Sequence, residues 1–163
     1  MSDDVTNADR AQWAAEALAA YNDRAPRDVL SLSLAQRVRI GIEAAEAMAR
    51  ETRTNPAEQV VDNRETADEL ITDLMAYVFH LAFGRIIPDQ LIRAAEEIRR
   101  PIPGTADTMR VLAAIEVDRV AAMLAALMDA AAAYGCDLAV MLANARGQFE
   151  TDMAEEADER LSA

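Results

Sequence analysis

The sequence predicts an all-α protein, a helical bundle of five or six helices. Ala dominates the apolar residues, which make up about half of the chain, and only 4% of residues are aromatic. Gly and Pro occur five times each, too rarely for the frequent turns of a β-sandwich or barrel. Apolar residues recur at helical spacing along most of the 163 residues, a length typical of a single domain.

Capping and breaking residues place the first helices. One is expected from about Asn7 to Tyr21, ending in the loop that contains Pro26. The segment 33–36, Ser-Leu-Ala-Gln, is a capping box and opens a helix that runs to about residue 53. Asn55 followed by Pro56 is expected to begin a short helix, with the asparagine as its cap and the proline in its first position.

The remaining helices follow from the same signals. Gly84 is expected to end the helix of the acidic segment 64–84 in a left-handed cap, and Pro88 to start the next, which ends near Arg100. A long Ala-rich helix is expected over 106–134, closed by a glycine at 135. A last helix, capped by Asp137, is expected to fray in the acidic tail 150–163.

Charge and composition exclude several functional classes. A net charge of −13 without a basic patch argues against nucleic-acid binding. A single cysteine, Cys136, excludes an internal disulfide and a cysteine-based zinc cluster. The N-terminus is polar and acidic, unlike a signal peptide, and the most apolar stretch, 120–142, is interrupted by Asp129 and Asp137. The expectation is therefore a cytoplasmic protein that does not insert into a membrane.

Six carboxylates lie at the edges of apolar stripes on two expected helices. Within each helix they stand three or four residues apart, and so on one face. Carboxylates crowded at an interior site favour a hard cation such as Mg²⁺, which binds oxygen ligands and activates water or phosphoryl groups. The alternative is a solvated acidic flank favoured by the helix dipole. The candidates are Glu43, Glu46, Glu65, Asp68, Glu69 and Asp73.

The order of these motifs resembles a known family. "IEAAEAMARE" followed by "ETADELITDLMAYVFHLAFGRIIPDQLIRAAEEIRR" is similar to the MazG-like all-α nucleoside triphosphate pyrophosphohydrolases, over about residues 33–103. The E-x-x-E motif of this family matches Glu43 and Glu46, and its E-x-x-D motif matches Glu65 and Asp68. The two motifs are separated by 18 residues, 47–64. The downstream segment 73–82 instead matches with Asp73 as the motif aspartate, and both registers remain open.

The resemblance implies a four-helix core and a Mg²⁺-dependent hydrolase, with Mn²⁺ as a substitute. It would cleave a nucleoside triphosphate to the monophosphate and pyrophosphate. Glu43, Glu46, Glu65 and Asp68 would be the catalytic residues and metal ligands, with Glu69 or Asp73 as a further ligand. Arg99 and Arg100 would contact the substrate phosphates. Such proteins assemble as homodimers or homotetramers, so an oligomer is expected.

The rival prediction is a non-enzymatic helical interaction or scaffolding protein, one form of which is a degenerate member of the same fold. A shift of 51 residues aligns the helix ends at Gly84 and Gly135 but places Asp68 on an arginine. The C-terminal helical pair, 104–163, would then be a repeat that has lost its carboxylates, and coincidence is the alternative. His80, the only histidine, is expected to be a packed core residue.

Overall fold

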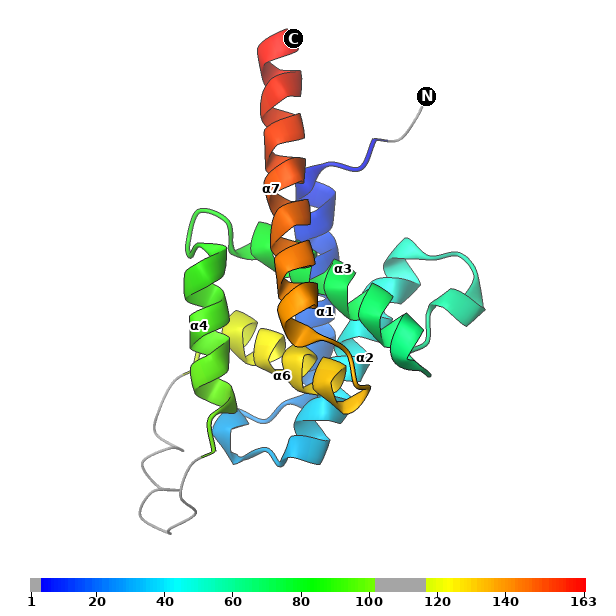
Figure 1. Ribbon diagram of the computed structural model, residues 1–163, viewed down its shortest axis with the longest axis vertical. Helices are drawn as coiled ribbons and strands as arrows, with labels where there is room; N and C mark the ends of the chain where they lie inside the picture. Colours follow the sequence, from blue (N-terminus) through cyan, green and yellow to red (C-terminus); the bar gives the residue numbers. More distant parts are fainter. Residues whose placement is uncertain (1–3, 102–116) are drawn as a thin grey trace.

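The computed structural model describes residues 4–101 and 117–163, and over these ranges the chain contains helices and loops but no strand. The predicted all-α class is confirmed for this part of the chain, where the helices pack into one bundle (Figure 1). The α-helices are α1 Asn7–Arg24, α2 Leu34–Thr52, α3 Arg64–Ala82, α4 Pro88–Arg99, α6 Arg119–Ala133 and α7 Leu138–Ser162. Two single 3-10 turns, η1 Val29–Ser31 and η2 Pro56–Glu58, lie on either side of α2.

The central element of the bundle is α6, whose residues 120–131 are all buried. It packs against α2, α3 and α4, while α1 packs against α2 and α3, and α7 lies mainly on α3. Small alanine side chains on α6 let these neighbours approach closely. The C-terminal part of α7 extends beyond the other helices (Figure 1).

The close approach is tightest where α2 crosses α6. A Cβ atom at Gly41 would lie 2.4 Å from the carbonyl oxygen of Ala126, well inside van der Waals contact. Only glycine fits here, because the neighbouring atom belongs to the backbone and does not rotate away. Gly41 therefore sets the distance between α2 and α6.

Most of the predicted helix ends are confirmed. The Ser33 hydroxyl accepts a hydrogen bond from the Gln36 amide at 3.2 Å, and the Gln36 side chain accepts one from the Ser33 amide at 2.8 Å. Gly84 and Gly135 have φ of 85° and 72°, the left-handed conformation expected where α3 and α6 end. The first helix continues one turn beyond the prediction, to Arg24, and the short helix at Pro56 is only η2.

Two predicted boundaries are wrong. The Ala-rich helix expected over 106–134 begins at Arg119, because Asp118 is non-helical and its carboxylate accepts hydrogen bonds from the amides of residues 120 and 121. Residues 102–116 lie outside the described part of the chain. The last helix does not fray but remains helical to Ser162. Asp152 and Glu156 tie it to α1, and Arg160 pairs with Glu156 at 3.3 Å one turn earlier.

Over the ranges 4–101 and 117–163, no helix combines the length and the apolar character needed to cross a membrane.

Candidate functional site

The two acidic residues predicted on α2 contact different parts of the chain. Glu43 lies 3.5 Å from the guanidinium of Arg24 at the end of α1. Glu46 accepts a hydrogen bond from the backbone amide of Val61 at 3.0 Å. The carbonyl oxygen of Val61 in turn accepts a hydrogen bond from the Tyr134 hydroxyl at 3.2 Å. Glu46 therefore holds the segment that leads into α3, which is a structural contact.

The first acidic pair on α3 faces solvent. Glu65 lies in the first turn of α3 and is exposed, where the helix dipole favours a negative charge. Asp68 is also exposed, and its carboxylate accepts a hydrogen bond from the Thr72 hydroxyl at 3.4 Å. Burial, and then the negative charge of Asp68, raise the pKa of the nearby Cys136 thiol above its ordinary value. That thiol is therefore not activated as a nucleophile.

The second acidic pair on α3 contacts an arginine. Arg53, just after α2, donates a close hydrogen bond to Asp73 and lies 3.7 Å from Glu69. Burial raises the pKa of Asp73 above its ordinary value, although the hydrogen bond from Arg53 opposes the rise. The ring of Tyr77, one turn later, packs on Trp13 with ring centres 5.3 Å apart. The pair thus forms an ion-pair site between α2 and α3.

This arrangement does not form a preorganised metal site. Among the described residues, no group of three or more His, Cys, Asp or Glu side chains is placed to hold a metal ion. The oxygen atoms that a cation would need are directed to Arg24, the Val61 amide and Arg53. As they are arranged, the described residues do not converge on a site for Mg²⁺. The ligand role of the six carboxylates stays a prediction.

The two arginines predicted to contact phosphates, Arg99 and Arg100, lie at the C-terminal end of α4. Arg99 donates from Nε to Oδ1 of Asp129 at 2.8 Å, and Arg37 donates from Nε to Oδ2 of the same carboxylate at 2.8 Å. Asp129 is only 4% exposed, so one buried carboxylate joins α2, α4 and α6. Arg100 is exposed and pairs with Glu97 at 3.0 Å.

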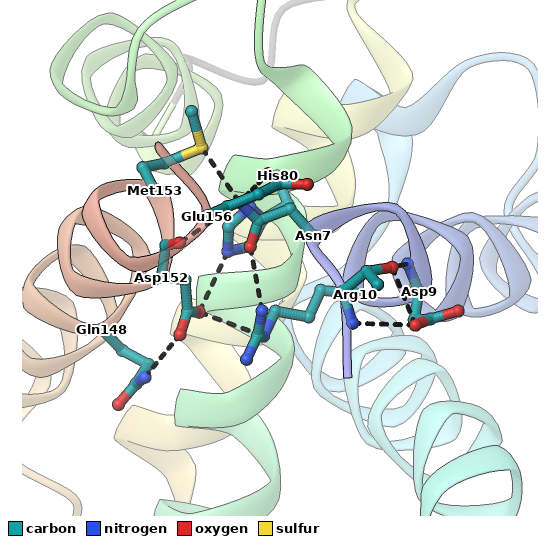
Figure 2. A network of polar contacts seen from close by, with 9 residues as sticks. Asn7, Asp9, Arg10, His80, Gln148, Asp152, Met153 and Glu156 are labelled. Atoms are coloured by element: carbon teal, nitrogen blue, oxygen red, sulfur yellow. Dashed lines mark hydrogen bonds and ion pairs between the residues drawn. The ribbon is translucent and has the colours of Figure 1, made fainter. Parts of the chain in front are cut away.

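A second buried carboxylate, Asp152 on α7, organises the polar network drawn in Figure 2. It is 2% exposed, and its Oδ2 lies 3.1 Å from Nε of Arg10 and 3.1 Å from Nε2 of His80. The Gln148 amide donates to its Oδ1 at 2.8 Å. Since a carboxylate accepts hydrogen bonds, the neutral His80 ring carries its proton on Nε2. The expectation that His80 is a packed core residue is confirmed.

The network continues to the start of α1. Asn7 donates to the carbonyl oxygen of Asp152 at 3.3 Å and to the carboxylate of Glu156, and its own oxygen accepts from Arg10 at 2.9 Å (Figure 2). Burial lowers the pKa of His80 below its ordinary value, although the hydrogen bond to Asp152 opposes this. The cluster joins α1, α3 and α7. Asn7, Arg10, Asp152 and Glu156 border a pocket of about 60 Å³, which is smaller than the range of about 300–1,000 Å³ found for small-molecule sites.

The sequence analysis did not predict the buried contacts of Asp129 and Asp152. Their arginine and histidine partners lie 30 to 142 residues away along the chain, so no local spacing reveals them. A signal did exist for Asp129, which is the only charged residue in the stretch 120–134. An isolated acid inside an apolar helix requires a buried partner, and arginine is the suitable one.

Comparison of the chain with known protein families, with curated proteins and with solved structures finds no match.

Proposed function

We propose that the chain is a non-enzymatic helical protein that acts by binding other molecules, as an interaction or scaffolding module. The observation that carries this proposal is the use of the acidic side chains. Glu46 accepts a hydrogen bond from the backbone amide of Val61. Glu43 forms an ion pair with Arg24, and Asp73 forms one with Arg53. These groups stabilise the bundle instead of being held ready for a substrate.

Two further contacts support a scaffolding role. Asp129 links α2, α4 and α6, and Asp152 links α1, α3 and α7, so each buried carboxylate connects three helices. In the described ranges, the one buried side-chain polar atom without a hydrogen-bond partner is an oxygen of Asp28. Buried networks whose members are all satisfied make a bundle rigid, and a rigid body suits a protein that presents surfaces to partners.

Thermal unfolding with and without divalent cations tests the proposal. A site with a dissociation constant of about 0.1 mM would stabilise the fold by about 2.7 kcal/mol at about 10 mM Mg²⁺. In a chain of this size, that corresponds to a rise in melting temperature of several degrees. We expect no rise beyond that produced by NaCl at equal ionic strength. A larger rise with Mg²⁺ or Mn²⁺ that is absent from the double variant Glu46→Gln, Asp68→Asn would overturn the proposal.

The second candidate function is the Mg²⁺-dependent nucleoside triphosphate pyrophosphohydrolase suggested by the resemblance. The observation that favours it is the position of Arg99 and Arg100, which border one cavity together with Arg37. Three arginines around one cavity suit phosphate groups. This candidate requires release of pyrophosphate that depends on Mg²⁺ and is lost on Glu46→Gln. It also predicts a homodimer or homotetramer, which light scattering would measure.

A further inference from the structure

A cavity of about 550 Å³ lies between the segment containing η1, the start of α2, the end of α4 and α6. We call it the Arg99 cavity. In Figure 1, the light-blue segment with η1 lies beside the lower end of α4. The volume falls within the range of about 300–1,000 Å³ found for small-molecule sites. None of the six carboxylates predicted on α2 and α3 borders this cavity.

The polar side of the cavity carries excess positive charge. Arg37, Arg99 and Arg100 border it, and among the residues that the structure describes Asp129 is the only acid that does so. Asp129 accepts from the Nε atoms of Arg37 and Arg99, so one negative charge is shared between two guanidinium groups. The side chains of Arg37 and Arg99 are 18% and 26% exposed, and thus screened from water but still reachable. Arg100 is exposed and pairs with Glu97 at 3.0 Å, so its charge is partly offset.

The guanidinium groups are held in fixed orientations. Asp129 binds the Nε atoms of both Arg37 and Arg99, and among the described residues the terminal nitrogens of Arg99 have no hydrogen-bond acceptor. A guanidinium with its stem fixed loses little further entropy on binding, and its planar donors match a phosphate or carboxylate.

The other side of the cavity is apolar. Leu30, Leu32 and Ile98 are partly buried residues that border it. We propose that the Arg99 cavity binds a small organic anion, in which a phosphate or carboxylate group contacts the arginines and an apolar body contacts the leucines and Ile98. This site goes beyond the proposed scaffolding role, since it assigns a ligand class without requiring catalysis.

Binding of model anions tests the proposal directly. The full chain is titrated calorimetrically with phenyl phosphate, benzoate and inorganic phosphate, at constant ionic strength in chloride. We expect phenyl phosphate or benzoate to bind more tightly than inorganic phosphate, and the stronger of the two identifies the charged group. If inorganic phosphate binds as tightly as phenyl phosphate, the apolar part of the site is overturned. If none of the three binds, the whole proposal is overturned.

Paired arginine variants locate the site. Arg100→Gln removes a charge from the cavity without touching Asp129, and we expect it to weaken binding about tenfold, the loss of one charge-assisted hydrogen bond. Arg93→Gln is the matched control, because Arg93 is exposed on the same helix but borders a separate groove with α7. Arg99→Gln should weaken binding further, and circular dichroism checks that it folds. Equal dissociation constants in the Arg100→Gln, Arg93→Gln and unaltered chains would overturn the assignment.

Discussion

The imidazole of His80 on α3 lies 3.1 Å from the carboxylate of Asp152 on α7, and both side chains are almost completely buried. The same carboxylate also neutralises Arg10 of α1 (Figure 2). Three helices that are distant in sequence therefore depend on one aspartate. The first predictions concern the energy of this contact and its dependence on pH.

Replacing Asp152 with alanine should destabilise the fold by about 3 kcal/mol, because it leaves the largely buried Arg10 without its counter-charge. The free energy of unfolding in urea measures the effect. Asp158→Ala is the matched control, since Asp158 is an exposed residue on the same helix, and it should change stability little. If both variants unfold at the same urea concentration, Asp152 does not hold the bundle together.

Acidification should weaken the fold through His80. Burial lowers the pKa of His80 in the folded chain, despite the attraction of Asp152 and Glu156, and Arg10 also lowers it. At a pH below the ordinary histidine pKa of about 6.5, the unfolded chain therefore binds a proton at His80 more readily than the folded chain does. Stability contributed by neutral His80 is present above about pH 6.5 and is lost as the pH falls toward the lower folded value.

The measurement is urea unfolding between about pH 7.5 and 5.5, a window above the titration of ordinary carboxyl groups. The unaltered chain should lose about 1 kcal/mol over the lower half of this window, and His80→Gln should lose less. A gain in stability on acidification of the unaltered chain would mean that the attraction of Asp152 outweighs burial.

Gly41→Ala should destabilise the chain by about 1–3 kcal/mol, because the added methyl group meets the backbone of α6 and forces the helices apart. Gly147→Ala provides the control. Apart from its chain neighbours and the backbone of α7 itself, no atom of the described chain lies within 4 Å of a Cβ atom at Gly147, so alanine there should stabilise by about 0.5–1 kcal/mol. Thermal unfolding of the two variants should therefore shift in opposite directions, and equal shifts would argue against the close crossing of α2 and α6.

The features predicted correctly from the sequence are local ones. The capping box at Ser33 and Gln36 and the left-handed glycines at 84 and 135 depend on residues within one helical turn of each other. The start of α6 was missed although Asp118 is a good capping residue, because the alanine-rich pattern continues across it. At that boundary the capping hydrogen bonds of Asp118 define the helix start, and the apolar spacing does not.

The candidate site was harder to predict for a physical reason. Spacings of three or four residues place carboxylates on one face of a helix, but do not define how two helices rotate against each other. Arg53 occupies the position beside Asp73 and Glu69 where a cation was expected, and nothing in the motif spacing indicates this. The partners of Asp129 and Asp152 depend on long-range packing in the same way.

The central claim is that the chain binds without catalysis, and a nucleotide hydrolysis assay tests it most directly. The chain is incubated with each common ribo- and deoxyribonucleoside triphosphate in the presence of Mg²⁺ or Mn²⁺, and released pyrophosphate is measured. We predict no release above that of the variant Glu46→Gln, Asp68→Asn. Pyrophosphate released by the unaltered chain, dependent on the divalent cation and abolished in that variant, would contradict the account and establish the hydrolase.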